Sequence, residues 1–117
     1  MQLTLLKGKI HRARVTECNL HYAGSIGIDE DLMAAANILP YERVSVANVT
    51  NGSRFDTYVL PAPKGSGTIA IYGAAAHLAK LGDIIIIFAW ANMDEKEAKA
   101  FKPSICLVDE NNKVKFA

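Results

Sequence analysis

The fold of this chain is decided by its longest apolar run, Ile84-Ile85-Ile86-Ile87-Phe88-Ala89-Trp90-Ala91. The run is rich in β-branched and aromatic residues and apolar throughout, which is typical of a strand buried on both faces. It follows Gly82-Asp83, a pair that ends the preceding segment. It is far shorter than the ~20 residues that a membrane-spanning helix needs. We therefore expect residues 84–91 to form a strand through the core of a β protein.

Shorter segments around this run are also regular. Strands are predicted over residues 3–16, 20–28, 44–49, 54–60, 68–72, 104–108 and 114–116. Short helices are predicted over residues 29–37, 73–81 and 94–101. The Asn51-Gly52 pair favours a hairpin, and Cys18-Asn19 is expected to form a turn. Many short strands with few short helices indicate a mainly β chain that closes into a small barrel.

Alternation along two strands predicts which polar side chains lie together. Past Gly8, an expected bulge or bend, one face should carry Lys9, His11, Ala13 and Val15, and the other Ile10, Arg12 and Arg14. Over residues 54–60, one face should carry Arg54, Asp56 and Tyr58, and the other Phe55, Thr57 and Val59. Lys9 is therefore expected beside His11, and Arg54 beside Tyr58.

Composition bounds the class of protein. A chain of 117 residues, half of them hydrophobic, suits a single domain with its own core. Cys18 and Cys106 lie far apart without a CxxC or Cys/His cluster, so neither a metal site nor a disulfide framework is predicted. The N-terminus lacks the pattern of a signal peptide. We expect a soluble cytoplasmic protein that does not bind a membrane.

The first part of the chain is locally basic, although the formal net charge is only +1. Its cations are Lys7, Lys9, Arg12 and Arg14, with His11 among them. A small basic β-barrel that binds nucleic acid is one alternative function, and a plain solvated face is another. No aromatic ring alternates with these cations to stack on bases. We therefore expect no nucleic-acid partner.

A second informative stretch is His21-Tyr22-Ala23-Gly24-Ser25-Ile26. Gly24 has no Cβ and tolerates unusual backbone conformations, so the Ser25 hydroxyl can fold back onto the Gly24 carbonyl. Attack there converts the peptide bond to an ester, and elimination of the ester leaves dehydroalanine, which hydrolyses to a ketone. The new N-terminus would be a pyruvoyl group. A plain turn is the ordinary alternative, since Gly-Ser pairs are common in turns.

Several motifs agree in order and spacing with one family. They are Lys7-Gly8-Lys9-Ile10-His11-Arg12, His21-Tyr22 before Gly24-Ser25, Val49-Thr50-Asn51-Gly52-Ser53-Arg54-Phe55-Asp56-Thr57-Tyr58, and Gly73-Ala74-Ala75-Ala76-His77 followed by Gly82-Asp83. From about residue 5 to residue 108, the chain resembles the pyruvoyl-dependent aspartate 1-decarboxylases.

The resemblance implies a six-stranded double-psi β-barrel with short helices, assembled as a homotetramer with active sites between subunits. It implies a zymogen that cleaves itself between Gly24 and Ser25 into chains 1–24 and 25–117. The implied cofactor is the pyruvoyl group formed from Ser25. The implied reaction is α-decarboxylation of L-aspartate to β-alanine and CO₂, which serves pantothenate and coenzyme A biosynthesis.

The resemblance also implies roles for individual residues. Tyr58 occupies the proton-donor position, and its phenol is protonated at neutral pH. Arg54 would hold the substrate's side-chain carboxylate through two parallel hydrogen bonds, with Lys9 as a second cation. Backbone N–H groups at the start of a helix would bind an anion. These groups belong to Gly73, Ala74 and Ala75.

Self-cleavage has its own implied residues. Thr57 would contact the Gly24 carbonyl and stabilise the oxyanion that forms there, and it also belongs to the implied substrate pocket. His11 and Tyr22 are supporting candidates. Without the resemblance, each of these side chains has an ordinary structural role as a packing residue or a solvated charge.

The chain departs from the family at two positions. Tyr72 stands before Gly73 where an asparagine is expected, so we expect slower maturation. Ala47 replaces a bulky aromatic that forms one wall of the pocket, so the pocket should be reshaped.

A self-processing hydrolase that keeps Ser25 as a free N-terminal nucleophile is a further alternative function. It differs from the decarboxylase by one ammonia, because the amine of Ser25 survives cleavage in the hydrolase.

Overall fold

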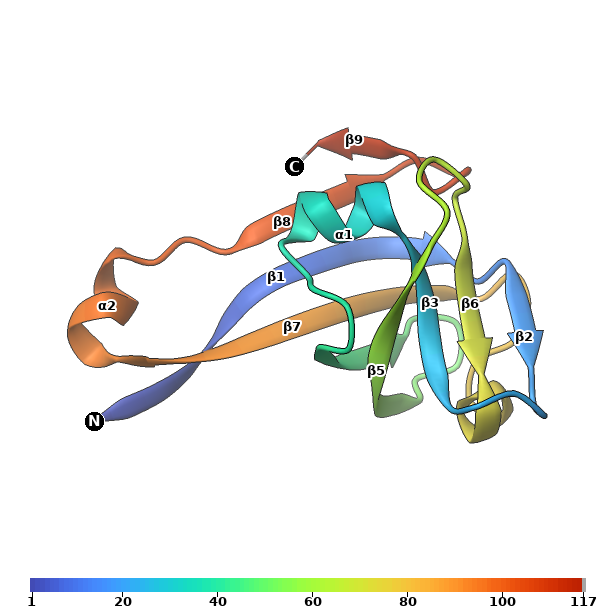
Figure 1. Ribbon diagram of the computed structural model, residues 1–117, viewed down its shortest axis with the longest axis horizontal. Coiled ribbons are helices and arrows are strands. Elements are labelled where there is room, and N and C mark those ends of the chain that lie inside the picture. The colour runs from blue at the N-terminus through green and yellow to red at the C-terminus, as the bar shows by residue number, and fades with distance from the viewer. Residues whose placement is uncertain (117) are drawn as a thin grey trace.

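The protein, seen here in a computed structural model that describes residues 1–116, forms one curved sheet with three short helices (Figure 1). The strands are β1 (Gln2–Arg14), β2 (Glu17–Asn19), β3 (Ser25–Asp29), β4 (Arg43–Asn48), β5 (Arg54–Ala62), β6 (Ile69–Tyr72), β7 (Ile84–Asp94), β8 (Ser104–Val108) and β9 (Val114–Phe116). The helices are α1 (Glu30–Ala36), the 3₁₀ helix η1 (Gly73–His77) and α2 (Glu95–Ala100).

The order across the sheet is β2-β6-β3-β5-β4-β7-β1-β8-β9. Figure 1 shows β1 and β7 as a long ribbon that β3, β5 and β6 cross steeply. Parallel and antiparallel pairs are mixed, since β3 runs parallel to β5 but antiparallel to β6. The mainly β prediction is confirmed. The described residues form nine strands rather than the six that were expected.

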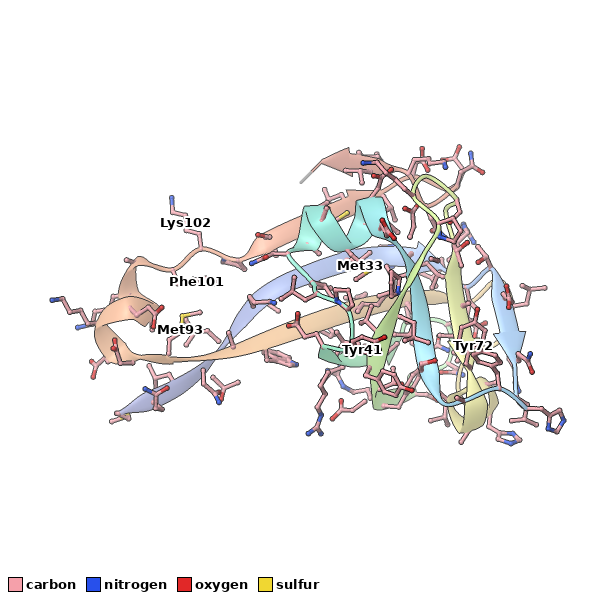
Figure 2. The ribbon with its side chains drawn as sticks, in the orientation of Figure 1. Met33, Tyr41, Tyr72, Met93, Phe101 and Lys102 are labelled. Carbon is pink, nitrogen blue, oxygen red and sulfur yellow. The ribbon has the colours of Figure 1, made fainter. Side chains whose placement is uncertain are left out.

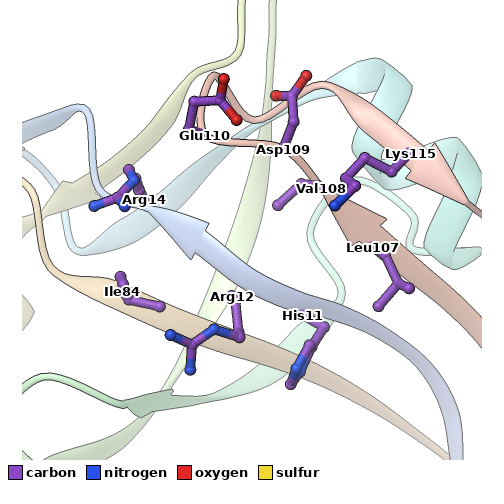
Figure 3. Close-up of a pocket in the computed structure, with 9 residues that line it drawn as sticks. All are labelled: His11, Arg12, Arg14, Ile84, Leu107, Val108, Asp109, Glu110 and Lys115. Carbon is purple, nitrogen blue, oxygen red and sulfur yellow. The ribbon is translucent and has the colours of Figure 1, made fainter.

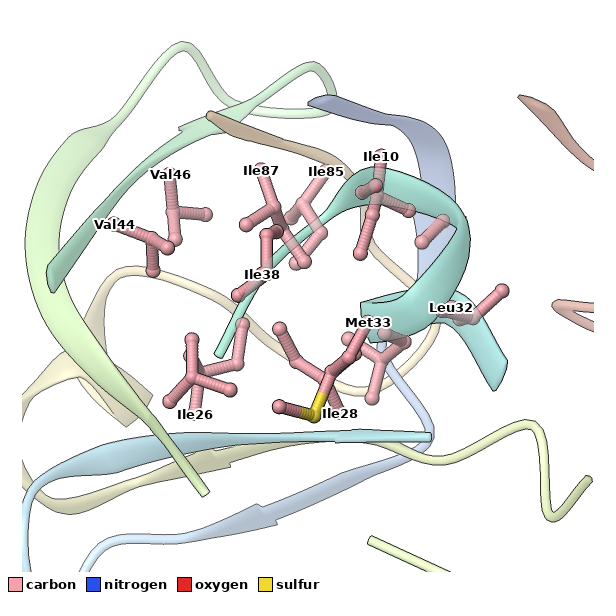
Figure 4. Close-up of a cluster of buried hydrophobic side chains, with 14 of the residues drawn as sticks. Ile10, Ile26, Ile28, Leu32, Met33, Ile38, Val44, Val46, Ile85 and Ile87 are labelled. Carbon is pink, nitrogen blue, oxygen red and sulfur yellow. The ribbon is translucent and has the colours of Figure 1, made fainter. Parts of the chain in front are cut away.

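The apolar run that begins at Ile84 forms the middle of the sheet, as predicted, because β7 pairs with both β1 and β4. Its expected burial on both faces is wrong for the single chain. Ile85, Ile87 and Ala89 are fully buried, whereas Trp90 keeps 43% of its surface exposed. Only one face of β7 meets the core, where Ile85 and Ile87 join the buried cluster (Figure 4). The other face is left as an apolar outer surface.

The predicted alternation along the first strand is also wrong beyond Ile10. The pairing of β1 with β7 shifts register between Ile10 and Ala13, and Arg12 adopts a left-handed backbone with φ 63°. A bulge of this kind puts an extra residue into one strand and re-aims the side chains after it. Ile10 and Ala13 therefore both face the core.

Two further boundaries differ from the predictions. The expected turn at Cys18 lies within the short strand β2, which pairs in parallel with β6. The strand expected from Leu20 begins only at Ser25, because residues 20–24 form a turn. The loop before Ser25 therefore carries the Gly24–Ser25 bond to the start of β3, which lies between β5 and β6.

The buried side chains form one cluster between the crossing strands and α1 (Figure 4). Asp29 caps α1 by accepting a hydrogen bond from Asp31 N at 2.8 Å, and it also accepts from Gly65 N and Gly67 N. Gly8 allows α1 to lie against β1, since a Cβ there would overlap with Ala36 O. In the described part of the chain, no helix has the length and apolar character needed to cross a membrane.

Candidate active site

The Gly24–Ser25 bond lies where the loop before β3 enters the sheet. Ser25 pairs with Tyr72 of β6, and none of its surface is exposed. Its Oγ donates a hydrogen bond to Ala23 O at 3.0 Å. The hydroxyl is thus buried one residue away from the Gly24 carbonyl, and it must exchange this partner before it attacks that carbonyl.

Gly73 presses directly against this bond. A Cβ at position 73 would lie 2.6 Å from Gly24 Cα and 2.9 Å from Gly24 N, and φ of Gly73 is +79°. Both facts require glycine here. The contact brings the start of η1, with Ala74 and Ala75, to the Gly24–Ser25 bond. Because η1 is a single 3₁₀ turn, what it offers there is backbone N–H groups rather than the dipole of a full helix.

Tyr72 covers the same region from β6 (Figure 2). Its ring contacts the Tyr22 ring, with centroids 4.8 Å apart and planes tilted by 51°. The ring also lies over Gly27, where a Cβ would stand 3.3 Å from Tyr72 Cε2. Burial, with a further contribution from Glu17, raises the pKa of the Tyr72 phenol. Tyr72 therefore ties the loop that holds Tyr22 to the sheet.

Tyr58 lies level with Ser25 on the neighbouring strand. Ile26 and Val59 are register partners in the parallel β3–β5 pair, and Ser25 and Tyr58 each precede one of them. Ile26 and Val59 are both fully buried in the core, so alternation turns Ser25 and Tyr58 to the opposite side of their strands. Tyr58 is 39% exposed. The fold therefore brings the predicted phenol donor beside the predicted cofactor residue.

Arg54 and Lys9 come together at a different part of the outer face. Arg54 Cζ lies 5.6 Å and Lys9 Nζ 5.9 Å from the centroid of the Phe88 ring. The burial pattern of β5 confirms that Arg54, Asp56 and Tyr58 share its outer face. β5 therefore carries Tyr58 beside the Gly24–Ser25 bond and Arg54 beside Lys9.

Among the described residues, no hydrogen bond joins Thr57 or His11 to the Gly24–Ser25 bond. Thr57 is half-buried on the inner face of β5, opposite Tyr58. His11 lines a pocket of about 360 Å³ with Arg12, Arg14 and residues of β8 (Figure 3). Burial, with Lys9 and Arg12 nearby, lowers the His11 pKa, and its buried Nδ1 has no hydrogen-bond partner.

Sequence reasoning missed Phe88, because the whole run from Ile84 to Ala91 reads as core. The one available signal was the run's own alternation: if Ile85, Ile87 and Ala89 face the core, Phe88 must face outward. Only the register of β7 with β1 and β4, and of β4 with β5, reveals which cations lie over it.

The fold and the site together define a class, a double-psi β-barrel protein with a buried Gly-Ser bond. Two rationally designed proteins of known structure, apDPBB_sym_79 and mkDPBB_sym1, are similar to this chain in fold. Their TM-scores are 0.53 and 0.50 at 18% and 16% identity, and the matches cover 76% and 74% of this chain and 98% and 99% of theirs. This likeness concerns the fold alone.

Residues 1–115 match the aspartate decarboxylase family, and the chain belongs to it. It is 57% identical over 114 residues to the aspartate 1-decarboxylase of Carboxydothermus hydrogenoformans, covering 97% of this chain and 90% of that protein. It is 58% identical to that of Thermoanaerobacter pseudethanolicus, covering 97% of each. For Burkholderia mallei the identity is 55%, covering 98% of this chain and 91% of that protein.

Proposed function

We propose that this chain catalyses the α-decarboxylation of L-aspartate to β-alanine and CO₂, a step toward pantothenate and coenzyme A. The observation that carries the proposal is the buried Gly24–Ser25 bond with Tyr58 level beside it on the next strand. The relatives named aspartate 1-decarboxylase support the choice of substrate.

The cofactor is a pyruvoyl group made from Ser25. Ser25 Oγ attacks the Gly24 carbonyl carbon, the C–N bond breaks, and an ester forms with a free amine on residue 25. Elimination releases Gly24 as a carboxylate and leaves dehydroalanine, whose imine tautomer takes up water and releases ammonia. The products are chains 1–24 and 25–117. Ser25 is fully buried in the uncut chain. Cleavage would therefore also be the step that exposes the new group to the substrate.

The remaining residues bind and protonate the substrate. Arg54 holds the side-chain carboxylate, and Lys9 supplies a second positive charge. The backbone N–H groups of Gly73, Ala74 and Ala75, together with Thr57, add polar contacts to the substrate. The pyruvoyl group would supply the electron-withdrawing centre that accepts the electrons left on Cα when CO₂ departs. Tyr58 delivers the proton to that carbon, because its phenol O–H is a proton donor that stands level with residue 25 on the next strand.

The active protein is a homotetramer in the cytoplasm, with each site completed between subunits. The half-exposed apolar row on β7, which includes Trp90 and Phe88, supports burial of this face by another copy. Both cysteines, Cys18 and Cys106, are free thiols, which suits a reducing compartment. Size-exclusion chromatography with light scattering tests the tetramer.

Intact mass spectrometry under denaturing conditions tests the cofactor, and a β-alanine assay tests the reaction. We expect chain 1–24 and a chain 25–117 that is one ammonia lighter than an unmodified serine start, together with β-alanine formed from L-aspartate. The matched control is Ser25→Ala, which should stay uncut and inactive.

A chain 25–117 that keeps its amine would favour the hydrolase alternative. An uncut wild-type chain that makes no β-alanine after prolonged incubation would contradict the proposed function.

A further inference from the structure

Two cations of the site, Lys9 and Arg54, share a single aromatic ring. Lys9 is the direct antiparallel partner of Phe88, so its side chain rises beside the ring. Arg54 starts on β5 and reaches past β4 to the same ring on β7. The two positive charges therefore meet over a strand that carries neither of them.

Ala47 leaves the path of Arg54 open. It lies on β4 between Arg54 of β5 and Ile86 of β7, as the register partner of both. A bulky side chain at this position would stand between the guanidinium and β7, since neighbouring strands are only ≈ 4.8 Å apart. The small side chain of Ala47 thus leaves room for Arg54 to reach Phe88. The aromatic ring at this point of the site comes from β7 and not from β4.

A chain of contacts orients the ring. Phe88 stacks on Trp90, with centroids 5.8 Å apart and planes at 18°. Trp90 Nε1 donates to Ser45 Oγ at 3.1 Å, and Ser45 Oγ donates to Asp56 Oδ1 at 2.7 Å. Arg43 Nη2 donates to Asp56 Oδ2 at 2.7 Å. The bonds from Arg43 and Ser45 hold the pKa of the Asp56 carboxyl below its ordinary value.

Lys9 and Arg54 remain available for an anion. Within residues 1–116, neither of them forms an ion pair with a carboxylate of the chain, and Asp56 is engaged by Arg43. The face of an aromatic ring attracts a cation without neutralising it. A ring that restrains two long side chains also reduces the rotamer freedom that substrate binding would otherwise remove.

We propose that Phe88 is a positioning residue that sets the spacing of Lys9 and Arg54 for a small dicarboxylate. This inference rests on the proposed function, since the dicarboxylate in question is L-aspartate. Phe88 acts through the two cations and not on the reacting atoms. Its removal should therefore weaken substrate binding, leave the chemical step unchanged, and reduce the preference for L-aspartate over L-glutamate, which is longer by one methylene.

The test compares Phe88→Leu with the wild type as full-length, self-cleaved protein. KM for L-aspartate should rise roughly five- to thirtyfold, the range that the loss of two cation–π contacts corresponds to, while kcat stays nearly unchanged. Phe88→Tyr keeps the ring and should retain the wild-type KM. The control is Phe101→Leu, a half-buried phenylalanine after α2 that lies far from Tyr72 (Figure 2) and should leave KM unchanged.

Succinate, a dicarboxylate that lacks the reacting amine, separates this inference from the proposed function. Weaker succinate binding by Phe88→Leu in calorimetry supports the role of Phe88 even if the wild type makes no β-alanine. Equal succinate affinity in the two proteins would overturn it. An unchanged KM, an equal rise in Phe101→Leu, or failure of Phe88→Tyr to retain the wild-type KM would overturn it as well.

Discussion

At the scale of single residues, Gly73 shows how the absence of a side chain allows two backbone segments to meet at Gly24. Its backbone lies against Gly24 so closely that a Cβ would fall 2.6 Å from Gly24 Cα. Its φ of +79° is also in the region that favours glycine. The sequence placed Gly73 in a candidate anion site. Its contact with Gly24 depends on a packing between distant segments that no local pattern encodes.

Gly73→Ala should therefore slow self-cleavage strongly. The new methyl group would displace Gly24, and with it the carbonyl that the Ser25 hydroxyl must attack. The measurement is the cleaved fraction over time by intact mass spectrometry. Gly82→Ala is the matched control: Gly82 has φ +86° but nothing within 4 Å of its Cβ position. It carries the same backbone strain of roughly 1–2 kcal/mol and should still cleave. Equal cleavage of the two variants would refute the steric explanation.

At the scale of elements, the β3–β6 pair decides what surrounds Ser25. The antiparallel register places Tyr72 opposite Ser25 and lays its ring over Gly27 and against Tyr22. The position of Tyr72 before Gly73 was visible in the sequence. That its ring packs against the loop before Ser25 follows only from the pairing of the strands.

Tyr72→Asn should speed self-cleavage by up to about tenfold, since an aromatic pair stabilises by ≈ 0.5–1.5 kcal/mol and this pair restrains the loop in which Ser25 bonds to Ala23 O. Quenched time points after expression, read by mass spectrometry, give the rate. Tyr72→Phe keeps the ring and should cleave at the wild-type rate. A Tyr72→Asn variant no faster than the wild type would show that the Tyr22 contact does not limit maturation.

At the scale of the whole molecule, residues 1–24 supply β1 and β2 to a sheet built mostly by the rest of the chain. β1 pairs with β7 along most of its length and with β8 on its other side. Its Ile10 and Ala13 are fully buried. A cut after Gly24 should leave these contacts intact, because they are non-covalent and none of them involves Gly24 or Ser25.

Chain 1–24 should therefore stay bound to chain 25–117 after cleavage. Native mass spectrometry should detect the two chains together, and denaturing conditions should separate them. The Ser25→Ala variant, which has no cut, provides the reference mass of the intact assembly. Loss of the short chain during native size-exclusion chromatography would contradict this expectation.

The sequence by itself determined the order and approximate bounds of most strands and helices, the proposed cleavage point between Gly24 and Ser25, and the shared outer face of Arg54 and Tyr58. These features follow from short-range patterns, such as alternation, caps and turn residues, that act within a few positions of the chain.

The tertiary structure alone decided which distant residues meet. It turned one face of β7 outward, placed Tyr58 level with Ser25, set Gly73 against Gly24, and brought Lys9 and Arg54 over Phe88. The physical reason is register. A bulge such as the one at Arg12 re-aims every side chain after it, so contacts across strands depend on the pairing of the whole sheet.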